Sequence, residues 1–224
     1  PLHVRVQFLQ DYSLDRERPL LWWFRSRESG SGAIGDLGSH AIDLARFVVG
    51  EVKRTCAVAK TFIKERPLEE EPNKKGRVDV DDACVALLEF KNGAIGTLES
   101  SRVYAGGSVL SLQVDCTNGT VAFNSDRCTV LRVYSGNETP EKQGFRAIKA
   151  SGAMHLGEEE AQLGYVESSG DTYRIELGMF LKSIAEDELF TPSFHDGAVN
   201  CAIIDAILES AKTEKWVNVP KPPK

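Results

Sequence analysis

Strand-like segments joined by Asn-Gly pairs constrain the fold of this 224-residue chain more than any other feature. Such segments flank both Asn92-Gly93 and Asn118-Gly119. Because Asn-Gly adopts positive φ angles readily, each pair predicts a tight turn between the two strands of a hairpin. Successive hairpins imply antiparallel pairing. The segments that flank these turns are residues 80–90, 94–103, 108–115 and 120–124.

Other segments extend this sheet or interrupt it. The segments predicted to be further strands are residues 2–10, 52–63, 128–134 and 145–150. Residues 11–30 are predicted to be a polar and aromatic loop around Trp22-Trp23-Phe24. The charged, Pro-containing residues 64–78 and the Gly-, Ser- and Glu-rich residues 151–170 are also predicted to be loops, the first of them mobile.

Three segments carry the apolar spacing of amphipathic helices. These are residues 33–49, 172–187 and 195–212. Ser193 and Asp196 match a capping box at the start of the last one. A helix, many antiparallel strands and two closing helices predict an α+β fold with a large, open, mainly antiparallel sheet. The helices should cover one face of the sheet and leave the other for a partner.

Composition excludes several classes of partner. Acidic and basic residues are interspersed and the net charge is −6, so no surface for nucleic acid or a membrane is expected. The longest apolar runs fall far short of the roughly 20 residues that span a bilayer, and no signal-peptide pattern opens the chain. The five cysteines are scattered without a C-x-x-C pair, which is typical of reduced thiols. A cytoplasmic protein is predicted.

The stretch Ser29–His40 reads SGSGAIGDLGSH and places Gly30, Gly32 and Gly35 in a G-x-G-x-x-G pattern. Such a loop binds a dinucleotide when it follows a buried strand and opens the helix of a βαβ unit. Here it follows the polar residues 25–29, so dinucleotide binding by this loop is not expected. Glycines also remove side-chain bulk from the first helical turns. A ligand or another domain is therefore expected to approach the backbone closely there.

Asp36 and His40 are the residues in this stretch that suit proton chemistry. They are four positions apart and share one face of a helix, with Asp43 following on the same row. A histidine titrates near neutral pH, and a neighbouring carboxylate can orient its ring. Spacing alone favours a plainer interpretation, in which Asp36 caps the helix and His40 is hydrogen-bonded at the edge of the core. Two ligands are too few for a metal site, and none is predicted.

Residues 32–43 resemble the G-x-x-x-D-x-G-x-H-x-x-D signature of the glucose–fructose oxidoreductase/inositol dehydrogenase (Gfo/Idh/MocA) family. The likeness covers nearly the whole chain, but only the C-terminal domain of the family. The other segments that are similar to the family are Trp22–Arg25, Val80–Ala83, Asn92–Ala94, Arg174–Glu176, Asp196–Ala198 and Trp216-Val217. The fold implied by this resemblance is again an open, mainly antiparallel sheet with helices on one face.

The resemblance implies that a second domain completes the enzyme. Family members join an N-terminal Rossmann domain, which binds NAD or NADP, to an α+β domain that forms the substrate pocket. The exposed sheet face of that second domain usually builds homo-oligomers. Residues 1–224 are then expected to be one substrate-binding and oligomerisation domain, a fragment of a longer enzyme that is inactive alone. The abrupt start at Pro1 and the absence of a Rossmann domain and of its Glu-Lys-Pro motif from these residues agree with this expectation.

The chemistry of the family implies roles for individual residues. Hydride passes between a nicotinamide and a carbinol of a sugar, cyclitol or related polyol. His40 would be the general base that removes the hydroxyl proton as the hydride leaves, and Asp36 would orient His40 or bind the substrate. The implied substrate contacts are Trp22, Arg25, His155 and Tyr165. Family members often carry Trp-Arg where this chain has Trp22-Trp23, which leaves Arg25 as the candidate for the role of that arginine.

A different class of function is also compatible with the sequence. A sheet with one exposed face suits a non-catalytic binding or oligomerisation module on the same scaffold. The sequence before Pro1 distinguishes the two functions. A nucleotide-binding βαβ unit and a lysine there favour the enzyme, whereas an unrelated segment favours the module.

Overall fold

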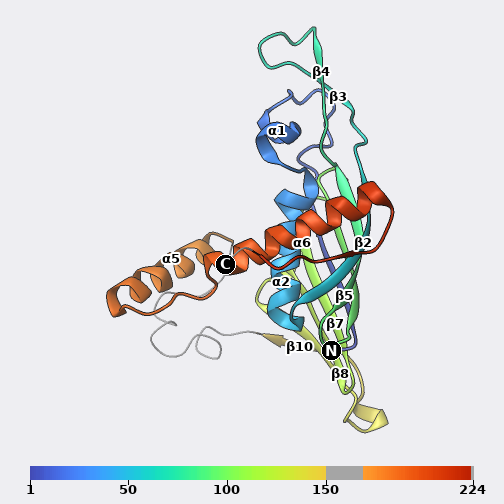
Figure 1. Ribbon diagram of the computed structural model, residues 1–224. Helices are drawn as coiled ribbons and strands as arrows, with labels where there is room; N and C mark the ends of the chain where they lie inside the picture. Colours follow the sequence, from blue (N-terminus) through green and yellow to red (C-terminus); the bar gives the residue numbers. More distant parts are fainter. Residues whose placement is uncertain (150–168, 223–224) are drawn as a thin grey trace.

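The computed structural model describes residues 1–149 and 169–222, and its main feature is one long sheet (Figure 1). Nine strands among these residues form it, in the order β10-β9-β8-β7-β1-β6-β5-β2-β11. The strands are β1 (His3–Leu9), β2 (Val52–Lys60), β5 (Ala83–Phe90), β6 (Ile95–Ser101), β7 (Val109–Cys116), β8 (Gly119–Asn124), β9 (Val130–Ser135), β10 (Arg146–Lys149) and β11 (Val217–Asn218). The predicted open, mainly antiparallel sheet is confirmed. The loop predicted over residues 151–170 lies almost wholly outside the described residues.

The first strand of the chain lies at the centre of this sheet. β6 and β7 follow one another in the sequence, but β1 inserts between them. β1 runs antiparallel to β7 and parallel to β6, while the other neighbouring strands of the sheet pair antiparallel. Gly96 of β6 permits the close pairing, because a Cβ atom there would lie only 2.9 Å from the carbonyl oxygen of Val4. Because β1 and β6 are parallel, the loops that follow these two strands leave the sheet at the same end.

Two helices cover one face of the sheet (Figure 1). α2 (Ser39–Val49) continues from a wide π-helical turn (Ile34–Gly38), and α6 (Phe194–Thr213) lies across the strands beside it. The predicted capping box is present at the start of α6. Apolar side chains from both layers are buried between them. They include Val4, Val6, Leu98 and Leu112 of the sheet with Ile34, Ile42, Ile203 and Ile207 of the helical layer.

The opposite face of the sheet carries no helix among the described residues (Figure 1). Val58, Val85 and Leu87 point from it and are 62%, 50% and 48% exposed. Val58 of β2 is paired directly with Val85 of β5, so these side chains form a continuous apolar strip. The helices therefore cover one face only, as predicted.

α5 (Ser169–Glu186) extends away from the sheet (Figure 1). It confirms the helix predicted over residues 172–187 and begins three residues earlier. The apolar stripe of this helix, Leu177, Phe180, Leu181 and Ile184, is exposed to solvent. No helix in the described part of the chain is long and apolar enough to cross a lipid bilayer.

The prediction of a loop over residues 64–78 is wrong at both ends of the segment, which are strands. The segment forms a short hairpin that projects beyond one end of the main sheet (Figure 1). Its strands are β3 (Glu65–Pro67) and β4 (Lys75–Arg77). Arg66 is fully buried, and its guanidinium donates to the carbonyl oxygens of Ser13 and Asp15 at 2.6 and 2.7 Å and stacks 4.1 Å from the ring centre of Phe24. These contacts of Arg66 with a distant loop anchor the hairpin. The charged composition of the segment does not reveal them.

Candidate active site

Three carboxylates in the segment before β5 organise the loops around the start of α2. Asp79 accepts hydrogen bonds from the backbone N–H and the hydroxyl of Ser26, at 2.6 and 2.9 Å. These bonds hold the pKa of Asp79 below its usual range, and the bond from the Ser26 backbone has the larger effect. They also fix the start of the short helix α1 (Ser26–Ser29). Asp81 and Asp82 bind two neighbouring segments in the same manner.

Asp81 fixes the glycine-rich turn that leads into α2. Its carboxylate accepts from the backbone N–H groups of Gly32 and Ile34, both at 2.8 Å, and its carbonyl oxygen accepts from Ala33 at 3.0 Å. A Cβ atom on residue 32 would lie 1.8 Å from that carbonyl oxygen. The close approach expected at the glycines is therefore made at Gly32 by the chain's own backbone, and not by a ligand or another domain.

Asp82 forms a buried ion pair with Arg102, which follows β6. The two side chains are 0% and 1% exposed, and both Nε and Nη2 of Arg102 lie 3.0 Å from Oδ1 of Asp82. The other carboxylate oxygen accepts from the backbone N–H groups of Phe62 and Ile63. The Arg102 guanidinium also stacks 4.6 Å from the ring centre of Phe24, beside Arg66. This buried pair, which also binds the backbone N–H groups of Phe62 and Ile63, holds the loops at the edge of the sheet in one arrangement.

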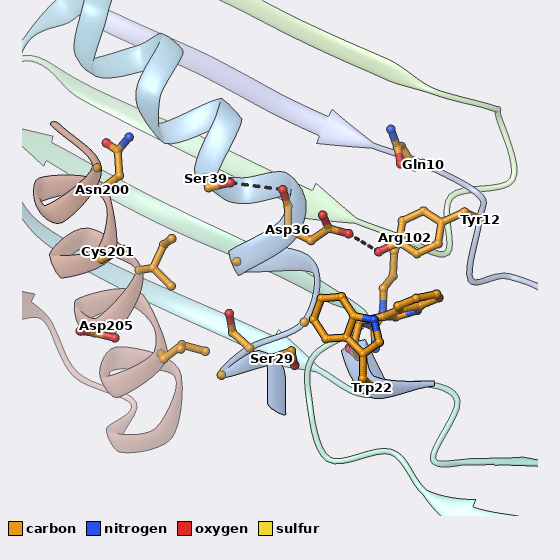
Figure 2. A pocket seen from close by; sticks show the side chains of 18 of the residues that line it. Gln10, Tyr12, Trp22, Ser29, Asp36, Ser39, Arg102, Asn200, Cys201 and Asp205 are labelled. Carbon is orange, nitrogen blue, oxygen red and sulfur yellow. Dashed lines mark hydrogen bonds between the residues drawn. The ribbon is translucent and has the colours of Figure 1, made fainter. Parts of the chain in front are cut away.

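Asp36 is exposed on the π-helical turn, where it is hydrogen-bonded to Tyr12 (Figure 2). The Tyr12 hydroxyl donates to Oδ2 of Asp36 at 2.5 Å, and the Ser39 hydroxyl donates to the Asp36 carbonyl oxygen at 3.2 Å. Burial and the Asp36 carboxylate raise the pKa of Tyr12 far above its usual value, although the nearby charge of Arg102 acts in the opposite direction. Tyr12 therefore remains a protonated hydrogen-bond donor throughout the neutral pH range.

A cleft of about 960 Å³ opens beside Asp36. One wall comes from the loops that follow β1 and β6, and the other comes from α6 (Figure 2). The polar and aromatic side chains that line it are Gln10, Tyr12, Arg18, Trp22, Trp23, Ser29, Ser31, Asp36, Ser39, Arg102, Asn200 and Asp205. Trp22 is 56% exposed and meets Trp23 edge to face, with ring centres 5.6 Å apart. Exposed aromatic rings next to hydroxyl, amide and carboxylate groups suit a polyhydroxylated ring with an apolar face.

The α6 wall is held in place by Arg46 of α2. The Arg46 guanidinium donates to Oδ1 of Asn200 at 2.8 Å and forms an ion pair with Asp196 at 3.6 Å. The Asn200 amide in turn donates to Asp43 at 2.8 Å. Asp43, the last residue of the motif on α2, thus ties the two helices together and leaves Asn200 at the edge of the cleft.

The structure brings together some of the predicted site residues. Asp36 and Trp22 line the same cleft. His40 lies one turn further along α2, is exposed, and packs its ring edge-on against Phe8 with ring centres 5.7 Å apart. His40 is not among the residues that line the cleft, and no hydrogen bond joins it to Asp36 among the described residues. Both side chains nevertheless contact the segment from Phe8 to Tyr12, so they face the same side of the helix.

The other predicted substrate contacts lie elsewhere. Arg25 is paired with Glu28 at 3.4 Å and borders a separate hollow together with Leu21 and Leu68. His155 and Tyr165 lie outside the described residues. Sequence reasoning missed Tyr12 and Arg102, which follow β1 and β6. Parallel pairing of those strands would have placed both residues at one edge, but the hairpin signals indicated only antiparallel pairing.

The open sheet, the helices on one face and the cleft at the start of α2 place this chain in the class of oxidoreductase C-terminal domains. The sequence profile of the GFO/IDH/MocA C-terminal domain matches residues 1–122, and the chain belongs to this family. It is 37% identical to levoglucosan dehydrogenase of Pseudarthrobacter phenanthrenivorans, over 98% of this chain and 60% of that protein. It is 28% identical to myo-inositol 2-dehydrogenase of Thermotoga maritima, over 86% of this chain and 50% of that protein.

Solved structures show the same relationship. Levoglucosan dehydrogenase in complex with NADH and L-sorbose superposes with a TM-score of 0.91 at 38% identity, covering 98% of this chain and 58% of that one. The complex with NADH and levoglucosan gives a TM-score of 0.90 at 38% identity, covering 98% of this chain and 59% of that one. The chain thus spans about 60% of the length of the levoglucosan dehydrogenase it matches.

Proposed function

We propose that the chain is the substrate domain of an NAD(P)-dependent dehydrogenase that oxidises a carbinol of a sugar, cyclitol or related polyol. The observation that carries this proposal is Asp36, which lines a cleft together with an exposed Trp22 and lies on the helical segment that bears His40. The names of two relatives support it, because levoglucosan and myo-inositol are both cyclic and polyhydroxylated. A tryptophan platform and several hydroxyl and amide groups are the side chains that such a ring requires.

The chain's own residues supply the proton chemistry of this reaction. A sugar hydroxyl is a very weak acid, so its proton must be removed as the hydride leaves the same carbon. We assign that step to His40, whose ring is exposed on the same helical segment. Asp36 accepts a hydrogen bond from the substrate and holds the carbinol in place. Trp22 carries the apolar face of the ring, and Arg25, His155 and Tyr165 remain weaker candidates for substrate contacts.

The hydride acceptor, NAD or NADP, is assigned to a separate nucleotide-binding domain of a longer two-domain protein. The described residues do not form a dinucleotide loop of their own. The backbone of Asp81 fills the space beside Gly32. The glycine-rich turn also follows the short helix α1 and not a strand. Three structures of levoglucosan dehydrogenase are complexes with NADH, which supports the same class of cofactor here.

Residues 1–224 are proposed to assemble as a homo-oligomer through the uncovered face of the sheet. The apolar strip of Val58 and Val85 supports this assembly, since exposed apolar surface of this kind marks protein interfaces. The same strip also supports the alternative function, a non-catalytic oligomerisation module. Absence of any polyol oxidation by the full-length protein, together with oligomer formation, would favour that alternative.

Replacement of His40 tests the catalytic proposal. In the full-length protein, His40→Ala should lower kcat with levoglucosan and NAD⁺ by about 10²- to 10⁴-fold, because the general base is removed. The Kd for NADH, measured by fluorescence titration, should change by less than about twofold, since the cofactor is held elsewhere. His195→Ala, which removes an exposed histidine of α6 outside the cleft, is the matched control. Unchanged turnover of His40→Ala would refute the assigned base.

A further inference from the structure

We propose that Tyr12 is a positioning residue that holds the Asp36 carboxylate in the orientation needed to accept a substrate hydroxyl. This inference rests on the proposed function, because it assumes that Asp36 contacts the substrate. Tyr12 itself lies outside the glycine-rich motif and reaches the cleft from the loop after β1 (Figure 2).

Tyr12 and Asp36 are joined by a direct hydrogen bond with a defined donor and acceptor. The Tyr12 hydroxyl donates its single proton to Oδ2 of Asp36 at 2.5 Å. Among the described residues, no other side chain donates to this carboxylate, so Oδ1 is left to accept from a ligand. Once the proton of Tyr12 is committed to Asp36, its oxygen can act only as an acceptor towards the cleft. The pair therefore presents two acceptors to a ligand whose hydroxyl groups donate.

The loop that carries Tyr12 is fastened on both sides to the end of β6. The backbone N–H of Gln10 donates to the Ser101 carbonyl oxygen at 2.7 Å, and the N–H of Ser13 donates to the Arg102 carbonyl oxygen at 3.0 Å. Tyr12 lies between these two bonds, and its ring is therefore carried by a segment with little freedom. A hydrogen-bonding group on a rigid support orients its partner at low entropic cost.

Arg102, which lines the cleft, and the buried Asp82 lie behind Tyr12. Arg102 is 1% exposed and lines the cleft, and its Nη2 makes no well-aligned hydrogen bond with a described residue. Its charge acts on the Tyr12 hydroxyl, while burial and the Asp36 carboxylate act more strongly and keep the phenol protonated. Asp82 fixes Arg102 in turn. A chain of four side chains thus runs from the buried ion pair to the carboxylate in the cleft.

Double-mutant kinetics separate positioning from a merely structural role. In the full-length protein, Tyr12→Phe keeps the ring and removes only the hydroxyl. It should lower kcat with levoglucosan and NAD⁺ by about 10- to 100-fold, the usual value for a hydrogen bond to a charged group, with KM for NAD⁺ unchanged. In an Asp36→Asn background, Tyr12→Phe should lower kcat by less than about twofold, because the carboxylate that Tyr12 orients has already been removed. Tyr104→Phe, at an exposed tyrosine after β6 that does not line the cleft, is the control.

The possible failures are distinguishable. Wild-type kcat in Tyr12→Phe, or an equal loss in both backgrounds, would overturn the positioning role while leaving the role of Asp36 intact. Wild-type kcat in Asp36→Asn would instead overturn the proposed contact of Asp36 with the substrate, and the inference about Tyr12 with it. Thermal unfolding of each variant identifies any loss that comes from partial unfolding.

Discussion

At the scale of single residues, the π-helical turn that leads into α2 depends on the contact between Gly32 and Asp81. The two residues are far apart in the sequence, yet three backbone N–H groups of residues 32–34 are bonded to Asp81. The first N–H groups of a helix have no partner within the helix, so an outside carboxylate at this position satisfies them. Asp81 thereby fixes the direction in which Asp36 enters the cleft.

Gly32→Ala should therefore destabilise the domain. The added Cβ atom would lie 1.8 Å from the Asp81 carbonyl oxygen, so the turn and the segment that bears Asp81 must move apart. We expect a loss of about 2–3 kcal/mol in the free energy of unfolding, measured with urea. Gly144→Ala, where an added methyl group meets no atom within 4 Å, is the control and should change this free energy by less than about 0.5 kcal/mol. Equal stability of the two variants would contradict the assigned contact.

The residues of the site differ in how far sequence alone predicts them. Asp36 and His40 are recognisable because their spacing on a helix and the surrounding motif are local features. Tyr12 and Arg102 are not, because the parallel pairing of β1 with β6 brings both residues to the cleft that Asp36 also lines. The role of Asp43 was likewise hidden, since its partner Asn200 lies on α6. Local patterns identify groups with chemistry, and tertiary contacts decide which of them act together.

At the scale of secondary-structure elements, the start of α6 shows a predicted motif in its predicted place. The N–H of Ser193 donates to the Asp196 carboxylate at 2.8 Å. This bond is the main reason why the pKa of Asp196 lies below its usual range. The Ser193 hydroxyl and the charge of Arg46 lower it further. A carboxylate at the positive end of a helix is stabilised further by the aligned peptide dipoles.

The cap makes part of the stability of the domain dependent on pH. Because the pKa of Asp196 is lower in the folded state, its contribution is complete above the unfolded-state pKa of about 3.9 and is lost as pH falls through the folded-state pKa. Asp196→Asn should be less stable than wild type by about 1 kcal/mol at neutral pH. The two unfolding free energies, measured against pH, should converge in acid. A constant difference at all pH values would contradict an ionised cap.

Elements defined by local signals were predicted well, and those defined by distant contacts were not. The two Asn-Gly turns correctly separate β5 from β6 and β7 from β8. The hairpin of β3 and β4 was missed, because its anchor is the burial of Arg66 among carbonyl groups of a distant loop. The stripe on α5 predicted a helix correctly, but periodicity alone does not reveal that this stripe is exposed.

At the scale of the whole molecule, the uncovered sheet face gives a prediction about assembly. Leu87→Arg places a charge beside the apolar strip of Val58 and Val85 and should convert an oligomer of the chain into a monomer, since a buried unpaired charge is costly. Size-exclusion chromatography with light scattering measures this change. Phe47→Arg alters an exposed apolar side chain of α2, on the helix-covered side, and should leave the oligomer intact. A wild-type chain that is strictly monomeric would rule out this interface.

The insertion of β1 between β6 and β7 also governs how the domain folds. Local hairpins can form early on either side, but the two groups of strands join only when β1 is captured between them. Closing so long a loop costs chain entropy before pairing compensates for it, and such high contact order slows folding. The loops that carry Tyr12 and Arg102 follow β1 and β6, so we expect the cleft to be completed late in folding, when β1 docks between its neighbours.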